Sequence, residues 1–388
     1  MLLYSLGLMA ILLVVAYAVM ASKAEWVGQD VDAASRFPAL DGLRGLCASS
    51  VFIHHSVMAY GFYAAGKWKP ISGVSTYDGN YMGHLGSVGV MLFFMVTGFL
   101  FSDRLIRNGG KEDWIGFYRK RIKRIAPLYF FVVLTVIAIC MLSDAIKGNF
   151  LVGYGQVLQW FGFGFFPLPT LGGMGSTWTM VCGVLWTLAI EWQFYFLLPA
   201  IGVFCINSRT FLTFVFVVSL ASVLLALSKG IEVKTAVIAL CFCAGAIAAY
   251  LHSTPWRKYL AAWPMAVLSV ALLALDIKYR FSSYNLWSFL SVALIFWCAS
   301  NGNSFFGVLN FRPMKFLGVV SYSVYLCHGL VLFGASKAVG LGMSQYAMLT
   351  AVLLVPFCAL TYRYVERPFL TQRKADPQIS NPASATAA

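Results

Sequence analysis

The fold is decided by the stretch Leu40-Asp-Gly-Leu-Arg-Gly-Leu-Cys-Ala-Ser-Ser-Val-Phe-Ile-His-His55. This segment is otherwise apolar, yet it carries Arg44 near one end and His54 and His55 far inside. Ionisable side chains within a bilayer-spanning segment cost free energy, so they usually face a bundle interior or a wet cavity and mark a working site. We therefore take this stretch as the leading candidate for the functional site.

The composition around this stretch is that of a membrane protein. Of 388 residues, 60% are apolar and only 11% are charged, against roughly 25% charged residues in a soluble domain. The net charge of +14 does not indicate nucleic-acid binding, because the basic residues lie in short segments between long apolar runs. Cytoplasmic membrane loops have this pattern. The sequence predicts an all-α polytopic membrane protein that contacts lipids and no nucleic acid.

Cysteine and histidine spacing predicts no metal site. The nine cysteines fall almost entirely inside apolar runs and form no C-x-x-C pair, so they are interpreted as small core residues. The five histidines are dispersed apart from His54 and His55.

Eleven apolar segments are predicted to cross the membrane. The first has no Lys or Arg before it, which argues against a cleaved signal peptide. The positive-inside rule then places the N-terminus outside, most basic loops inside and the C-terminus in the cytoplasm. Residues 1–24 are predicted to be an extra transmembrane helix before a membrane domain at 36–370, and residues 375–388 a disordered cytoplasmic tail. The predicted spans are 2–20, 44–62, 85–103, 125–142, 184–206, 210–228, 234–251, 262–277, 284–300, 317–336 and 344–362.

The segment 151–166 is apolar but rich in glycine and followed by Pro167 and Pro169. Counting it as a span would invert every later loop and place the basic C-terminal segment outside, against the charge bias. We predict that it is re-entrant or lies at the outer interface.

Arg44 and His55 are predicted to share a helix face. They are separated by about 1100° of helical rotation, which is about 20° from three full turns, and by roughly 16 Å along the axis. His54 lies about 80° from Arg44 on the same arithmetic and is assigned a supporting role. Taken singly, Arg44 could be a topology anchor and His55 a hydrogen-bonded structural histidine of the core. Their shared face favours function, with His55 as a general base and Arg44 binding an anionic or carbonyl group.

Two further groups are candidates. Arg121 and Arg124, three residues apart in a basic run, share a helix face and could hold phosphates, although the run would also serve as a topology anchor. Glu191, with Tyr195 one turn later, lies in an apolar segment and needs a partner or a proton. An ion pair and a catalytic role both remain open for Glu191.

A polar stripe follows near the end of the chain, where Ser321, Tyr325 and His328 fall on roughly one helix face. Interhelical hydrogen bonding and direct catalysis both explain this stripe.

In their order along the chain, these motifs resemble the acyltransferase-3 family of membrane acyltransferases over most of the sequence. The sequence departs from the family pattern at Trp192, where members of that family often have a second acidic residue. The motifs that carry the resemblance are Leu40 to Ala48 with the Arg44-to-His55 spacing, Phe93-Phe-Met-Val-Thr-Gly-Phe99, Arg121-x-x-Arg124, Trp186-Thr-Leu-Ala-Ile-Glu-Trp-Gln-Phe-Tyr195, Leu317 to His328, and Val365-Glu-Arg-Pro-Phe369.

The resemblance implies a ten-helix bundle, here with one extra N-terminal helix, in the plasma (bacterial inner) membrane. It implies an O-acyltransferase that moves an acyl group, most often acetyl, from cytoplasmic acyl-coenzyme A to a hydroxyl of an envelope glycan or lipid-linked saccharide. Acyl-coenzyme A would be a co-substrate, with no tightly bound cofactor. Arg121, Arg124 and Arg44 would bind this donor, His55 would act as general base or acyl relay, and Glu191 and His328 would line the same cavity.

Other functions remain open from the sequence alone. A transporter would use the buried Arg, His and Glu residues as a relay, and a sensor or scaffold would need no chemistry. The acceptor could also be a small secondary metabolite, because specificity depends on pocket shape and loops.

Overall fold

A computed structural model of the chain describes residues 1–22, 24–32, 35–70, 75–147, 152–279, 284–337 and 340–370. Within these ranges the chain is helical, with an isolated β-bridge between Leu171 and Met174 and no strand. This confirms the predicted all-α class. The predicted tail at 375–388 lies outside the described residues.

The first half of the chain forms seven α-helices and one short 3₁₀ helix, η1, within the described residues. In order they are α1 (Leu2–Ala21), α2 (Glu25–Val31), α3 (Pro38–Ala65), α4 (Thr76–Arg107), α5 (Trp114–Ile146), α6 (Tyr154–Trp160), η1 (Thr177–Val181) and α7 (Trp186–Phe204).

The second half continues with further helices and includes a π-helical turn, η3, before the last short helix. In order they are α8 (Ser208–Leu227), α9 (Val233–His252), α10 (Arg257–Leu260), α11 (Trp263–Tyr279), α12 (Leu286–Ser300), η2 (Val308–Asn310), α13 (Arg312–Val319), α14 (Ser321–Ala335), α15 (Met343–Thr361), η3 (Tyr362–Glu366) and α16 (Arg367–Leu370).

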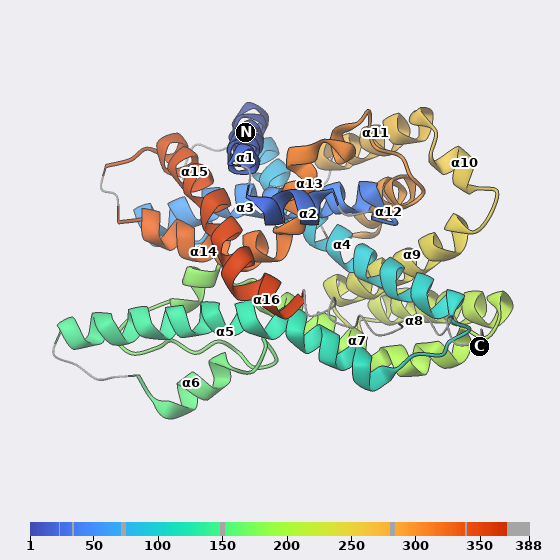
Figure 1. Cartoon of the computed structure of the whole chain (residues 1–388), viewed down its shortest axis with the longest axis horizontal. Helices are drawn as coiled ribbons and strands as arrows, with labels where there is room; N and C mark the ends of the chain where they lie inside the picture. Colours follow the sequence, from blue (N-terminus) through green and yellow to red (C-terminus); the bar gives the residue numbers. More distant parts are fainter. Residues whose placement is uncertain are drawn as a thin grey trace, which may run out of the picture.

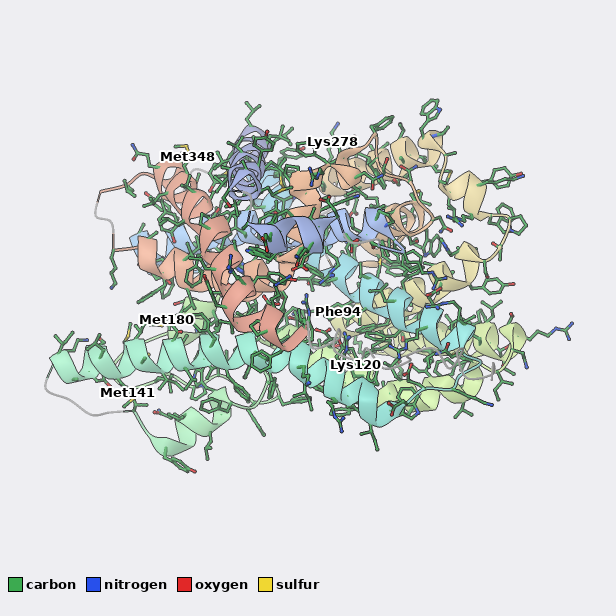
Figure 2. All side chains as sticks on the ribbon, viewed as in Figure 1. Phe94, Lys120, Met141, Met180, Lys278 and Met348 are labelled. Carbon is green, nitrogen blue, oxygen red and sulfur yellow. The ribbon has the colours of Figure 1, made fainter. Side chains whose placement is uncertain are left out.

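Helix α3, which contains the stretch from Leu40 to His55, is central to the packing. It packs against α4, α13 and α14, while α4 packs in turn against α9, and α1 lies on α15 and α13. Helix α5 runs along one edge of the molecule with α6 beside its C-terminal half (Figure 1). Side chains fill the spaces between the helices, and Phe94 of α4 lies near the centre (Figure 2).

Seven of the described helices are long and apolar enough to cross a membrane, or eight if α13 and α14 form one span. The protein is therefore polytopic, as predicted. Helices also form at the predicted spans 44–62, 262–277 and 284–300, but α3, α11 and α12 do not reach this standard of length and composition.

The predicted span at 317–336 is divided between two helices, α13 and α14. The chain bends by 75° between α13 and α14, at Val320. The physical reason is packing: α13 is held closely against α3, and α14 takes a different direction from it.

Glycines allow this close packing of α3 and α13. A Cβ atom on Gly45 would overlap the carbonyl oxygen of Met314, and one on Gly318 would overlap the carbonyl oxygen of Asp41. Glycine pairs of this kind let two membrane helices approach to backbone contact. The small residues of α4 act likewise, since a Cβ on Gly98 would lie 2.5 Å from the carbonyl oxygen of Phe242 in α9.

The segment 152–166 does not form a spanning helix. Its helix α6 has seven residues, about 10 Å at 1.5 Å per residue, which is too short for a hydrocarbon core of about 30 Å. Leu151 lies outside the described residues. The structure thus agrees that this segment is not a full span.

We expect Gly45→Ala to destabilise the protein by about 1–3 kcal/mol, because the added methyl group meets backbone atoms of α13 that cannot rotate away. The measurement is the thermal unfolding midpoint of detergent-purified protein. Gly7→Ala in α1 is the matched control, since nothing lies within 4 Å of its added Cβ. Equal midpoints for the two variants would contradict the packing described here.

Candidate active site

A cavity of about 560 Å³ opens among α2, α3, α4, α5, α7, α13, α14 and η3. Seven of the predicted site residues lie on its wall, brought together from four helices. They are Arg44 of α3, Arg121 and Arg124 of α5, Glu191 and Tyr195 of α7, and Ser321 and Tyr325 of α14.

The two arginines of α5 on the cavity wall, Arg121 and Arg124, are held differently. Arg124 Nη1 lies 3.5 Å from Glu366 Oε2, so this guanidinium has a buried acidic partner. Arg121 lies against the ring of Phe101, 5.3 Å from its centroid. The Nε atom of Arg121 is buried and makes no hydrogen bond. The cavity wall therefore contains a buried cationic donor whose hydrogen-bonding capacity is incompletely used.

Glu191 is the acidic counterpart of this arginine group. Its carboxylate accepts a short hydrogen bond from the Tyr195 hydroxyl, one helical turn later. Arg121, Arg124 and Arg44 all act on it electrostatically. The predicted basic neighbours from other helices are thus present, and Glu191 partly balances the positive charge of the wall.

His55 and His328 contact each other directly. Nδ1 of His55 lies 2.9 Å from Nε2 of His328, so α3 and α14 are joined by a direct imidazole pair. Nδ1 of His328 lies 3.0 Å from the carbonyl oxygen of Val324 in its own helix. His328 is fully buried, and its orientation is fixed on both sides of the ring.

The histidine pair adjoins the cavity without being part of its wall. Tyr325 lines the cavity, and its ring centroid lies 6.3 Å from that of His328. The Tyr325 hydroxyl also exchanges a 3.0 Å hydrogen bond with Thr187 at the start of α7. Arg44 and His55 therefore stand at different depths along α3, one on the cavity wall and the other beyond Tyr325.

His54 faces a different helix. Its Nδ1 lies 2.7 Å from the carbonyl oxygen of Met82 in α4, and a Cβ on Gly86 would lie 2.7 Å from its ring. The His54 side chain therefore packs against α4, whereas His55 contacts α14. The two histidines point in different directions, as the helical periodicity predicted.

Sequence reasoning missed Cys182, which joins the histidine pair. Its Sγ and one ring nitrogen each of His55 and His328 lie within 4.8 Å of one another. Such a trio could hold a metal ion, but the 2.9 Å between the two nitrogens is shorter than the about 3.3 Å expected for two nitrogens of a tetrahedral zinc site. The nitrogens are spaced as a hydrogen-bonded pair. No sequence signal joined Cys182 to residues so distant along the chain.

Glu366 was also missed as a partner of the cavity. It lies in the π-helical turn η3, is buried, and accepts a short hydrogen bond from Ser323 besides its pairing with Arg124. Single-turn π-helical segments occur frequently at functional sites. In the sequence, Glu366 stood out only as part of the motif Val365 to Phe369.

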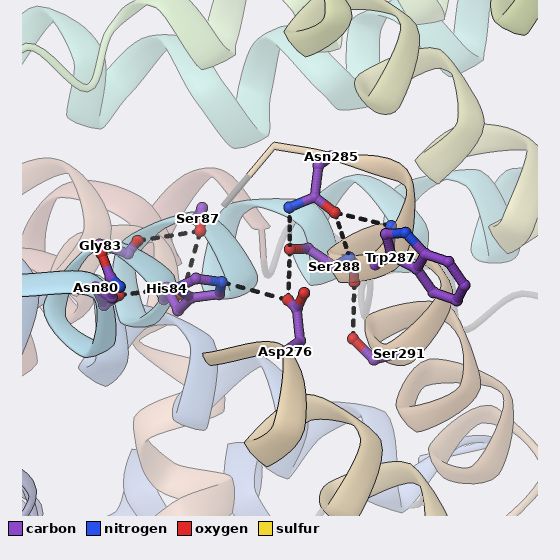
Figure 3. Close-up of polar contacts among 9 residues, drawn as sticks. All are labelled: Asn80, Gly83, His84, Ser87, Asp276, Asn285, Trp287, Ser288 and Ser291. Carbon is purple, nitrogen blue, oxygen red and sulfur yellow. Dashed lines mark hydrogen bonds and ion pairs between the residues drawn. The ribbon is translucent and has the colours of Figure 1, made fainter. Parts of the chain in front are cut away.

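A second buried polar cluster lies between α4, α11 and α12 (Figure 3). His84 Nε2 lies 3.3 Å from Asp276 Oδ2, and Ser288 donates a 2.5 Å hydrogen bond to the same oxygen. Here the carboxylate stands between the histidine and the serine. Activation of a serine nucleophile requires the histidine in the middle, so we interpret this cluster as a tie between helices.

The sequence profile described as an acyltransferase domain matches residues 37–363. The chain belongs to this acyltransferase family. The match covers all the cavity residues from α3 to α14 and the histidine pair, so the observed site lies inside the family domain.

The chain is also similar to several named proteins. The chain is 23% identical to "Putative peptidoglycan O-acetyltransferase YrhL" of Bacillus subtilis, over 86% of this chain and 55% of that protein. It is 25% identical to "O-acetyltransferase OatA" of Staphylococcus aureus, over 85% of this chain and 57% of that protein. The chain thus spans about half the length of these two relatives.

A third relative is matched over most of its own length. The "O-acetyl transferase" of Shigella phage Sf6 is 22% identical, over 76% of this chain and 87% of the phage protein. No solved structure matches the chain.

We expect Asp276→Ala to lower the stability of the protein by about 1–3 kcal/mol, because it leaves His84 and Ser288 buried without their shared partner. Asp32→Ala is the matched control. Asp32 and its partner Arg312 are 54% and 62% exposed, and an exposed pair contributes less than about 1 kcal/mol. Thermal unfolding of the two purified variants checks this, and equal midpoints would show that the buried cluster is not a structural tie.

Proposed function

We propose that this chain is a membrane O-acetyltransferase that moves an acetyl group from cytoplasmic acetyl-coenzyme A to a hydroxyl of an envelope or exported glycan. The observation that carries the proposal is the His55–His328 pair, which adjoins an arginine-lined cavity through Tyr325. Membership of the acyltransferase family and the printed names of the relatives support the reaction class.

The cavity suits the donor. Its volume of about 560 Å³ is in the range of small-molecule sites, about 300–1,000 Å³. Arg44, Arg121, Arg124 and Lys315 contribute positive charge to the wall, and guanidinium groups bind phosphates by paired, charge-assisted hydrogen bonds. The coenzyme's phosphates would lie at these residues. The positive-inside bias supports a cytoplasmic opening for this end of the site.

The histidine pair has the hydrogen-bond order that a general base requires. A carbonyl oxygen can only accept, so Nδ1 of His328 carries a proton, donated to Val324. In the neutral pair, Nε2 of His328 then accepts the proton on Nδ1 of His55. This leaves the lone pair of His55 on Nε2. His328 acts as the orienting group, and the base is Nε2 of His55.

The chemistry follows from that assignment. The acceptor hydroxyl would give its proton to His55 as its oxygen forms the new bond to the acetyl carbonyl carbon. The carbon–sulfur bond of the thioester breaks, and the coenzyme leaves as a thiolate that takes a proton from the imidazolium. Positioned general bases contribute about 100- to 10,000-fold in rate.

A glycan acceptor is supported by the name of one relative, which specifies peptidoglycan. The test is mass spectrometry of envelope glycans from cells with and without the gene. The proposal expects the mass of acetyl groups to disappear from glycan fragments when the gene is removed. Unchanged glycans together with an altered small metabolite would replace the glycan by that acceptor.

We expect His55→Ala to lower the rate of acetyl transfer by about 100-fold or more, because the base is lost, while binding of coenzyme A is retained. His252→Ala is the control, since His252 lies at the end of α9 and bonds to the carbonyl of Ser300. Initial rates and calorimetric binding are measured on detergent-purified protein. Full activity in His55→Ala would remove the proposed base.

We expect Arg121→Ala to weaken acetyl-coenzyme A binding by about 10- to 100-fold, the effect of one charge-assisted hydrogen bond. Lys120→Ala removes the same charge from an exposed neighbour that does not line the cavity. Calorimetric dissociation constants decide the outcome. Equal losses in the two variants would show that only general surface charge matters, and the donor would not be held in this cavity.

A further inference from the structure

Cys182 occupies a defined position between two parts of the site. It is the residue that ends η1, four residues before α7 begins, and its side chain is buried at 5% exposure. Its sulfur lies within 4.8 Å of a ring nitrogen of His55 and of one of His328. In the part of the chain that the structure describes, no other group of three potential metal or proton ligands meets this criterion.

We propose that Cys182 carries the acetyl group between donor and acceptor, as a thioester on its Sγ. This inference rests on the proposed O-acetyltransferase function and deepens it, because it assigns the covalent intermediate to a named atom. The proposed function does not require it, since direct transfer from coenzyme A to the hydroxyl would use the same histidine base.

The first half-reaction exchanges one thioester for another. The imidazole pair takes the proton of the Cys182 thiol, and the sulfur attacks the carbonyl carbon of acetyl-coenzyme A. A new carbon–sulfur bond forms at Cys182 while the bond to the coenzyme sulfur breaks. The coenzyme leaves as a thiolate and takes the proton from the imidazolium.

The second half-reaction regenerates the thiol. The acceptor hydroxyl gives its proton to the imidazole as its oxygen bonds to the acetyl carbon. The carbon–sulfur bond at Cys182 breaks, and the departing thiolate takes the proton back. The products are the O-acetyl ester and the free enzyme, with no oxidant, reductant or further reactant.

The chemical argument for sulfur is the pairing of a thiol with an imidazole. Such a pair is the usual means of activating a cysteine nucleophile, because the thiolate is the reactive form. The first step also breaks and forms the same kind of bond, so the acetyl group keeps its thioester activation after the coenzyme leaves. An acetyl group on an imidazole nitrogen would lack this match with the donor.

The location of the sulfur supports a relay. The cluster adjoins the cavity through Tyr325, which contacts His328. Trp68, whose ring is 6.0 Å from that of His55, and Trp178, whose ring is 5.0 Å from that of Trp68, lie near it as well. The sulfur of Cys182 thus belongs to a cluster that neighbours both the arginine-lined cavity and an aromatic pair, which is the position that a relay requires.

The test uses the full chain, purified in detergent and mixed with radiolabelled acetyl-coenzyme A without acceptor. We expect label that survives denaturation, is released by neutral hydroxylamine as a thioester is, and maps by peptide mass spectrometry to Cys182. We also expect labelled coenzyme A to exchange into acetyl-coenzyme A in the absence of acceptor. A merely structural cysteine would give neither signal.

The informative variant is Cys182→Gly. Cys182 has φ 50° and ψ 24°, a left-handed conformation in which glycine carries no steric penalty, so the backbone can keep its path without the sulfur. We expect this variant to bind coenzyme A as before, to lose label and exchange, and to transfer acetyl groups about 1,000-fold more slowly. Cys298→Ala, in buried α12, is the control and should retain label and rate.

The outcomes separate the two proposals. If the wild type acetylates glycan but carries no label, and Cys182→Gly remains active, the relay is overturned and direct transfer stands. Label on His55 instead of Cys182 also overturns the relay. If the wild type transfers nothing from acetyl-coenzyme A and carries no label, the proposed function and the relay fall together.

Discussion

The site depends on the backbone contact between α3 and α13. Gly42, Gly45 and Gly318 each occupy a place where any Cβ atom would overlap a carbonyl oxygen of the opposite segment. Lipid tails are as apolar as leucine, so two membrane helices gain little from hydrophobic burial and must associate by close packing. The glycines supply that packing next to Arg44, and so fix the position of the cavity wall relative to the rest of α3.

The bend after α13 follows from the same contact and completes the site. Helix α13 packs along the first turns of α3. If the chain continued straight after α13, the next residues would keep the direction of α13. The 75° change of direction at Val320 starts a new helix, α14, which contacts α3 farther along. There His328 meets His55 at 2.9 Å. One helix, α3, is therefore contacted by α13 near Arg44 and by α14 near His55.

The sequence predicted the groups on single helices better than the contacts between helices. Arg44 and His55 could be placed on α3 from a repeat of about 100° per residue, and the structure puts both on its packed side. The break at Val320 could not be predicted, because residues 317–336 contain no proline and their polar stripe fits one helix face. Helix breaks that depend on a neighbour's packing leave no local signal.

Partners from distant segments were equally inaccessible. The sequence showed that Glu191, in an apolar segment, needs a partner or a proton. It could not show which arginines lie near Glu191, because that depends on the packing of α3, α5 and α7. Cys182 and the pair of His84 with Asp276 are further cases. Each is a single polar or sulfur-bearing residue in an apolar context, for which a structural interpretation was reasonable until a second chain segment was placed beside it.

The distribution of charge separates structural from functional groups. Away from the cavity, Asp103 is engaged by both Arg36 and Arg107, as expected where ionic groups only hold helices together. At the cavity wall, by contrast, the buried Nε atom of Arg121 makes no hydrogen bond. A buried donor left unsatisfied costs about 1–3 kcal/mol. In this chain that donor lies on the cavity wall, where an anionic ligand would satisfy it and bind more tightly for that reason.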